Sequence, residues 1–169
     1  MRPAPLRNRL VLGRLDAWPA REALLPKVTA CVAAAADYLE RTCHAGQASR
    51  SASDWVAEVD ADHLRRLFLL TFGDEVAGLL DLALDTPVQG EVTLVLLVMV
   101  KVLRGRGLGR EAALALFAHL GTLGFERLRL GVAKGEPDAV RFWESLGLWP
   151  SGEEDGVRLF ELPLRQGGS

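Results

Sequence analysis

The sequence predicts an α/β fold of the α+β kind, with a mixed, mostly antiparallel central sheet and helices on both faces. The first observation is a β-hairpin, in which strands at Arg65–Phe72 and Val76–Asp85 flank the tight turn Gly73-Asp74-Glu75. The second is the strand–turn–helix–strand–helix order that follows from Val92. The 169 residues, 1–169, fit a single domain, which at that size buries roughly 70% of its unfolded surface without a disulfide or a metal.

Before the hairpin, we expect one strand, one long helix and one short helix. Arg9–Leu15 alternates apolar and polar residues, which is typical of a strand. Asp16 can cap a helix, Pro19 suits its first turn, and the apolar pattern continues to Leu39. The small and polar segment His44–Ser53 is expected to be a loop, and the stretch SDWVAEV that follows it is expected to be a short helix.

After the hairpin, each element has its own pattern. Val92–Val100 is apolar on both faces and is therefore expected to be a central strand. The remaining elements, in chain order, are a helix at Leu108–Leu120, a strand at Leu128–Ala133, a helix that Pro137 opens and Gly147 caps, and two short strands around the turn EEDG.

Composition and charge exclude several classes of function. The net charge is −2 and no long basic block is present, so we expect no nucleic-acid partner. The N-terminal MRPAPLRNRL has no apolar signal core, and Val92–Val100, the longest apolar run, is too short to span a bilayer. We therefore expect a cytoplasmic protein with no membrane partner. Cys31 and Cys43 indicate reduced thiols, and neither has a partner at metal-binding spacing, so no metal site is expected.

A basic, glycine-rich turn, Arg104–Arg110, joins the apolar strand to the next helix. Gly107 and Gly109 allow the backbone to approach a ligand closely, and the unpaired N–H groups at the helix start favour an anion such as a pyrophosphate. A helix end contributes about 0.3–2 kcal/mol, whereas micromolar binding needs about 8 kcal/mol, so such a ligand must also use direct hydrogen bonds and an apolar arm. The alternative is a tight turn with solvated arginines.

Two other phosphate-binding motifs fit this turn less well. No lysine follows the glycines, as a Walker A loop requires. The dinucleotide-binding pattern G-x-G-x-x-G/A is met by Gly107, Gly109 and Ala112. That fold is built from parallel βαβ units, however, and here an antiparallel hairpin precedes the turn.

The pattern R-x-x-G-x-G, met by Arg104–Gly109, resembles that of the GNAT superfamily of acyl-CoA-dependent N-acyltransferases. A second block, AVRFWESLGL at Ala139–Leu148, is similar to the family's other signature helix, and the resemblance is strongest over Leu94–Leu148. It implies a GNAT-like fold in which the strand before the glycine turn splays away from its parallel neighbour. It also implies an N-acetyltransferase that moves an acetyl group from its co-substrate acetyl-CoA to a primary amine, by direct attack in a ternary complex.

The resemblance also implies the contacts to the coenzyme. Main-chain groups that bind the pantetheine arm would come from Leu97, Val98, Met99 and Val100. A strand N–H near Met99 would polarise the thioester carbonyl. The turn would hold the pyrophosphate through the residues Arg104, Gly105, Arg106, Gly107, Leu108, Gly109 and Arg110. Trp143 would pack beside the channel for the thiol.

The family's acid and base residues are not evident here. Trp143 stands where many members have a tyrosine that protonates the leaving thiolate, and an indole N–H is a donor but not a practical acid. Glu136 replaces an asparagine that often contacts the cofactor, and Gly131 replaces a basic glutamate. The remaining candidates for a general base or acid are Glu91, Tyr38 and His44. Each also has an ordinary structural explanation, as a rim carboxylate, a core-packing ring and a solvated imidazole.

Two functions remain open on the sequence. The favoured one is an enzyme that acts on a small-molecule or protein amine, and the alternative is a non-catalytic acyl-CoA-binding module that serves as a sensor. Members of the family often dimerise, so a homodimer is open as well. Among other residues, Trp55 is expected to anchor its short helix, Trp149 to lie in the core, and Asp81 and Asp85 to be exposed.

Overall fold

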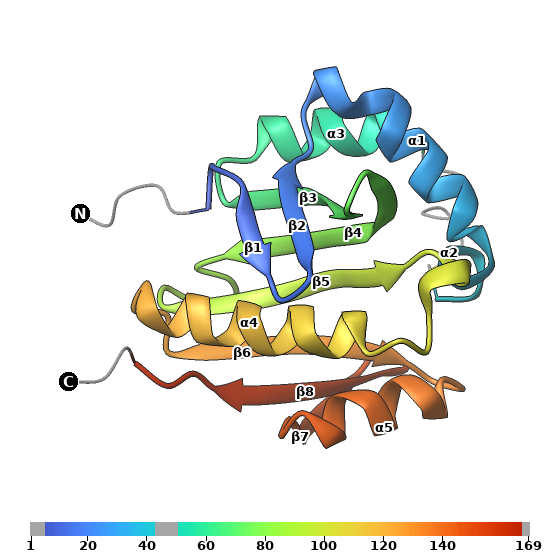
Figure 1. Ribbon diagram of the computed structural model, residues 1–169. Coiled ribbons are helices and arrows are strands. Elements are labelled where there is room, and N and C mark those ends of the chain that lie inside the picture. The colour runs from blue at the N-terminus through green and yellow to red at the C-terminus, as the bar shows by residue number, and fades with distance from the viewer. Residues whose placement is uncertain (1–5, 43–50, 167–169) are drawn as a thin grey trace.

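The computed structural model describes residues 6–42 and 51–166. These residues form an eight-stranded sheet in the order β1-β2-β3-β4-β5-β6-β8-β7, in which β5 and β6 are the one parallel pair (Figure 1). Its strands are β1 (Leu10–Leu12), β2 (Leu15–Pro19), β3 (Arg65–Phe72), β4 (Glu75–Leu84), β5 (Glu91–Met99), β6 (Arg127–Ala133), β7 (Trp149–Glu154) and β8 (Val157–Pro163). Its α-helices are α1 (Leu25–Ala34), α2 (Ala36–Thr42), α3 (Ala52–Ala61), α4 (Leu108–Thr122) and α5 (Pro137–Ser145).

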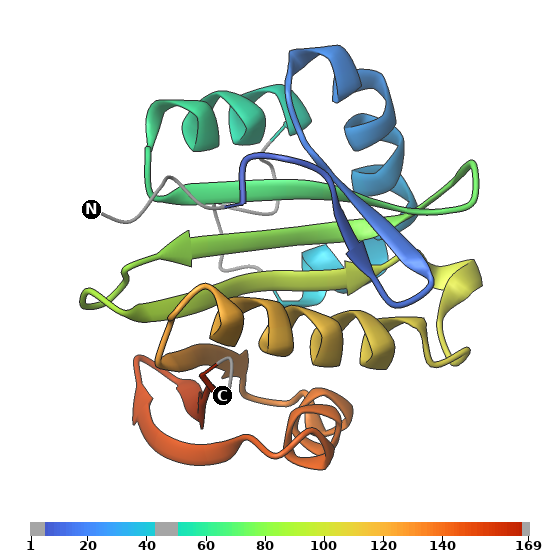
Figure 2. The same ribbon diagram turned by 60° about the vertical axis from the view of Figure 1, so that its left-hand side comes forward.

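Helices cover both faces of this sheet (Figures 1 and 2). On one face, α1 and α3 pack against each other and against β3 and β4. On the other face, α4 packs against β5 and the β1–β2 hairpin. Because β4 is covered on both sides, it is buried without interruption from Ala77 to Leu84. The mixed, mostly antiparallel sheet with helices on both faces is confirmed.

The parallel strands β5 and β6 are joined at one end only. Their pairing runs over Glu91–Thr93 and Arg127–Arg129. Directly afterwards the register between β4 and β5 shifts, because Leu94 and Leu96 pair with successive residues of β4 and Val95 is left out as a bulge. A bulge bends its strand and increases its twist, and from this point β5 runs apart from β6. The two splayed parallel strands are thus confirmed.

The N-terminal elements differ from the prediction. The sequence predicted a single strand at Arg9–Leu15 and a helix that begins at Asp16, but residues 15–19 form β2, which pairs with β1 in a hairpin and with β3. The apolar–polar alternation continues past the expected end of the strand, with Leu15 and Ala17 buried against the core. The helix begins only at Leu25, and it is interrupted so that α2 is separate from α1.

The prediction that Trp149 lies in the core is wrong. Its side chain is 46% exposed, and all six residues of β7 are exposed. The reason is the position of β7 at the edge of the sheet, where it has β8 as its partner strand.

Candidate active site

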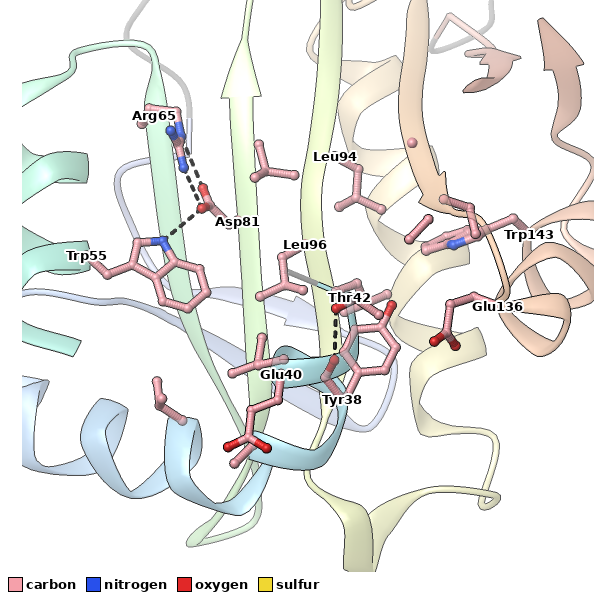
Figure 3. Close-up of a pocket in the computed structure, with 18 of the residues that line it drawn as sticks. Tyr38, Glu40, Thr42, Trp55, Arg65, Asp81, Leu94, Leu96, Glu136 and Trp143 are labelled. Atoms are coloured by element: carbon pink, nitrogen blue, oxygen red, sulfur yellow. Dashed lines mark hydrogen bonds and ion pairs between the residues drawn. The ribbon is translucent and has the colours of Figure 1, made fainter. Parts of the chain in front are cut away.

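A pocket of about 250 Å³ opens between the parted ends of β5 and β6. Figure 3 shows Leu94 and Leu96 of β5 on one side of it, and Glu136, the N-cap of α5, and Trp143, in the last turn of α5, on the other. Tyr38 of α2 reaches in between them. The residues that line the pocket are Val32, Ala36, Tyr38, Leu39, Glu40, Thr42, Trp55, Glu58, Arg65, Asp81, Leu94, Val95, Leu96, Leu97, Gly131, Val132, Ala133, Glu136 and Trp143.

The glycine turn lies at the start of α4, as the sequence predicts. Gly105 and Gly107 have φ angles of 78° and 77°, in the left-handed region that glycine adopts at low cost, and Gly107 is the N-cap of the helix. Within the described part of the structure, the amides of residues 105–110 donate to no other group. Unpaired N–H groups at the start of a 15-residue helix favour a bound anion.

Sequence reasoning missed a support for this turn, which is Arg14 in the β1–β2 turn. Its Nε lies 3.0 and 2.9 Å from the two carboxylate oxygens of Glu111 in the first turn of α4, and its Nη2 donates to the carbonyl oxygen of Arg106 at 3.0 Å. The hydrogen bond from Arg14 lowers the pKa of Glu111 below its usual value. The two partners are 97 positions apart, and no local pattern in the sequence links them.

The three arginines of the turn have different partners. The guanidinium of Arg104 donates to both carboxylate oxygens of Asp37 at 2.6 and 3.1 Å, and its Nε donates to the carbonyl oxygen of Met99 at 2.9 Å. The hydrogen bonds from Arg104 lower the pKa of Asp37 to about 2. Arg110 donates to a serine of α5 at 3.2 Å. The exposed side chain of Arg106 has no hydrogen-bond or ion-pair partner among the described residues.

Two ion pairs hold α2 beside the pocket. The Asp37–Arg104 pair ties it to the glycine turn. On the other side of the pocket, Arg41 Nε lies 2.7 Å from Glu136 Oε1 at the start of α5, and this hydrogen bond raises the pKa of Arg41. The short helix therefore bridges the two elements that follow the parted strands.

The backbone of β5 presents alternate residues to its two edges. The N–H of Val100 donates to the carbonyl oxygen of Ala77 in β4 at 2.8 Å. The carbonyl oxygen of Val98 likewise faces β4, at Gly78. By this alternation the amide groups of Leu97 and Met99 are directed away from β4, toward the gap between β5 and β6. The contact from Arg104 to the carbonyl oxygen of Met99 on that edge agrees with this direction.

A buried ionic cluster forms the far end of the pocket. Asp81 was expected to be exposed, but it is completely buried, because both faces of β4 are covered. Its carboxylate accepts from Trp55 Nε1 at 2.9 Å and from Arg65 Nη2 at 2.5 Å (Figure 3). Arg65 also lies 3.5 Å from Glu58. Trp55 is buried as expected, while Asp85, predicted to be exposed, is half-buried and accepts from a backbone amide.

The structure separates the residues considered as acid or base. Glu91 lies at the joined end of β5 and β6, outside the pocket lining, and accepts from Arg129 at 2.6 Å. Tyr38 and Trp143 both line the pocket, and Trp143 is 8% exposed. His44 falls outside the described residues. Gly131 lines the pocket on β6, where a Cβ atom would lie 2.6 Å from a methyl group of β8.

Residues 6–42 and 51–166 were searched for membrane-spanning helices and for metal-binding side chains. None of their helices is both long enough and apolar enough to cross a membrane. They contain no group of three or more His, Cys, Asp or Glu side chains placed to hold a metal ion.

A sequence profile of the Acetyltransferase (GNAT) family matches residues 30–148, and a search of curated protein sequences finds no match. Among solved structures, an acetyltransferase from Thermus thermophilus is 29% identical, with a TM-score of 0.77 over 92% of this chain and 100% of that chain.

Two other solved structures share the fold at lower identity. RimL, a ribosomal-protein alpha-N-acetyltransferase in complex with coenzyme A, is 15% identical, with a TM-score of 0.77 over 92% of this chain and 98% of that chain. The ribosomal-protein-S18-alanine N-acetyltransferase from Escherichia coli is 22% identical, with a TM-score of 0.65 over 91% and 96%. Since the family profile matches well over half of the residues, the chain belongs to the GNAT acetyltransferase family.

Proposed function

We propose that this protein transfers an acetyl group from acetyl-CoA to a primary amine, by direct attack of the amine in a ternary complex. The observation that carries the proposal is the parting of β5 from β6 after Thr93, directly beside a helix start with unpaired amides. A cleft of this kind offers polar main-chain groups and apolar walls to an extended arm, and it ends at an anion site. The structure of RimL in complex with coenzyme A, which has the same fold, supports this arrangement.

The parts of the coenzyme are assigned to separate elements. The amides of residues 105–110 bind the pyrophosphate, with the free charge of Arg106 beside them. Arg104 contributes mainly by fixing the turn to Asp37. The main-chain groups of Leu97 and Met99 hydrogen-bond the pantetheine arm, because those of the intervening Val98 face β4.

The chemistry requires no covalent intermediate on the enzyme. An acceptor that is cationic in solution first loses a proton to solvent, and the neutral amine nitrogen then attacks the thioester carbonyl. A tetrahedral oxyanion forms, and its C=O bond forms again as the C–S bond breaks with its electron pair on sulfur. A strand N–H near Met99 stabilises the oxyanion, and the proton lost by the amine passes to solvent. Positioning two reactants in one pocket can supply a large part of such a barrier.

The charge of the pocket favours an acceptor that is cationic in solution. Its charged lining residues are one guanidinium, that of Arg65, and the carboxylates of Glu40, Glu58, Asp81 and Glu136. Arg41, outside the lining, pairs with Glu136, so the carboxylates still outnumber the guanidiniums. An excess of carboxylates in a partly enclosed site attracts an ammonium group. Small-molecule amines and protein amines both meet this requirement.

The test measures binding and turnover separately. Isothermal titration with coenzyme A should show binding, and Gly107→Glu should abolish it, because the new carboxylate would face the pyrophosphate and the backbone there is left-handed. Release of free coenzyme A thiol is then followed with acetyl-CoA and a panel of polyamines, amino acids and peptides. Turnover with an amine supports the enzyme. Binding without turnover on any amine would instead support the acyl-CoA-binding module.

A further inference from the structure

The turn of the β1–β2 hairpin lies directly against the first turn of α4 (Figure 2). The approach is close because residue 13 is a glycine: a Cβ atom on Gly13 would lie 2.8 Å from Cβ of Glu111. Arg14, the next residue, donates from its backbone N–H to Oε2 of Glu111 at 3.3 Å, in addition to the hydrogen bonds of its side chain. A segment far from the glycine turn in the sequence is therefore fixed to it in the fold.

Glu111 places a carboxylate in the first turn of the helix whose start is proposed to bind a diphosphate. The hydrogen bond from Arg14 lowers the pKa of Glu111, so this side chain is negatively charged at neutral pH. A negative charge there is stabilised by the helix dipole, but it repels a second anion at the same helix end. Arg14 is the ion-pair partner of Glu111 among the described residues, and it supplies the compensating positive charge.

Arg14 also sets the direction of one amide of the turn. The carbonyl of Arg106 and the N–H of Gly107 belong to one trans peptide unit, in which the two groups point in opposite directions. Nη2 of Arg14 donates to this carbonyl oxygen at 3.0 Å, so the carbonyl faces the hairpin and the N–H of Gly107 is directed away from it. That N–H is one of the amides that donate to no other group among the described residues.

We propose that Arg14 is a positioning residue of the coenzyme site, which neutralises Glu111 and holds the peptide unit between Arg106 and Gly107 in the orientation that binds the diphosphate. This inference rests on the proposed function. It adds the β1–β2 hairpin to the elements that build the coenzyme site. Arg14 acts through the glycine turn and through Glu111.

The other charged groups of the glycine turn have different partners. Arg104 is paired with Asp37 of α2, and Arg110 donates to a serine of α5. The side chain of Arg106 has no hydrogen-bond or ion-pair partner among the described residues. The charge of Glu111 is thus compensated from the hairpin and not from its own turn.

The measurement is the dissociation constant of coenzyme A, obtained by isothermal titration. In Arg14→Gln the charge of Glu111 is no longer compensated. Two unit charges about 8 Å apart change a binding constant by about 2-fold in water and by about 30-fold at an effective dielectric constant of about 20. We expect the dissociation constant to rise by about 5- to 10-fold. Arg14→Lys, which keeps the positive charge, should stay within about threefold of the wild type.

Glu111→Gln distinguishes this role from that of a purely structural ion pair. Arg14→Gln and Glu111→Gln break the same pair, so both should lower the urea midpoint by similar amounts, and a structural pair would lose coenzyme affinity in both variants. Neutralisation predicts opposite signs, because Glu111→Gln removes the repulsion: its dissociation constant should fall by about two- to fivefold. The double variant has the wild-type net charge, and its dissociation constant should return to within about threefold of the wild type.

Arg9→Gln is the matched control. Arg9 precedes β1 and pairs with Asp16 of β2 at 2.5 Å, so the change removes the same charge and breaks another exposed ion pair of the same hairpin. Among the described residues, the side chain of Arg9 makes no hydrogen bond or ion pair with the glycine turn or with Glu111. The dissociation constant of coenzyme A should therefore stay within about twofold of the wild type.

The outcomes separate the two proposals. If the wild-type protein does not bind coenzyme A, the proposed function fails and this inference fails with it. If it binds and Arg14→Gln binds within twofold of it, the inference is overturned and the proposed function stands. Equal losses of affinity in Arg14→Gln and Glu111→Gln would also overturn it, because the pair would then act only as a structural contact. Should Arg14→Gln not fold, the tighter binding expected of Glu111→Gln decides, and weaker binding in that variant overturns the inference.

Discussion

Gly78 of β4 lies so close to β5 that a single added methyl group should disturb both stability and coenzyme binding. A Cβ atom at Gly78 would lie 2.1 Å from the carbonyl oxygen of Val98, 3.2 Å from its carbonyl carbon and 3.3 Å from the Cα of Met99. All three are backbone atoms of β5, so no side-chain rotation can relieve the contact. The separation must grow from 2.1 Å to at least 3.0 Å.

The displacement of β5 away from β4 in Gly78→Ala has two measurable consequences. Overpacking of this kind costs about 1–3 kcal/mol of unfolding free energy, which lowers Tm by about 2–12 °C for a chain of this size. A shift of β5 away from β4 moves it toward β6 and narrows the cleft, and a displacement approaching 1 Å in a site can cost roughly 100-fold in rate. We therefore expect kcat/KM for acetyl-CoA to fall by about 10- to 100-fold.

Urea unfolding and steady-state kinetics test these expectations, and Gly131→Ala is the matched control for the unfolding measurement alone, because Gly131 lines the pocket. A Cβ atom at Gly131 meets Cγ1 of Val157 at 2.6 Å. This is a side-chain methyl group that can move, so the loss of stability should stay below about 1 kcal/mol. The reasoning is refuted if Gly78→Ala unfolds at the wild-type urea midpoint and keeps its kcat/KM within twofold.

Three other predictions follow from buried or paired groups. Asp81→Ala removes the acceptor of Arg65 and Trp55, and breaking a buried ion pair costs about 3–5 kcal/mol, measurable as a lower urea midpoint. The pKa of Asp37 is lowered to about 2, so its pairing with Arg104 stabilises the fold above pH ~4, and this contribution is lost as pH falls from ~4 to ~2. Asp37→Asn should remove that part of the pH dependence of Tm. Burial raises the pKa of Cys31 to about 12, so peptide mapping after iodoacetamide treatment at pH 8 should find this thiol unmodified in the folded protein and modified in urea.

The features that the sequence determined by itself are those with local causes. The turn at Gly105–Gly109 and the start of α4 follow from backbone sterics and helix geometry, which act over a few residues. The β3–β4 hairpin likewise follows from a short turn between two apolar strands. These local patterns predict an anion-binding turn, and the resemblance to the GNAT family implies the other contacts to the coenzyme. Where the local signal was misread, at residues 15–19, the error came from ending an alternating pattern too early.

Tertiary structure alone decided the remaining features, because they depend on contacts between distant segments. The bulge at Val95 parts β5 from β6 through a register shift against β4, and register is a property of a strand pair. The sequence around Asp81 predicts an exposed side chain. The side chain is buried because helices cover both faces of the sheet. Trp143 of α5 lines the pocket together with residues of β5 only because the two segments meet in the folded chain. Local sterics specify the turn that is proposed to bind the pyrophosphate, whereas packing over the whole chain creates the pocket where the chemistry is proposed to occur.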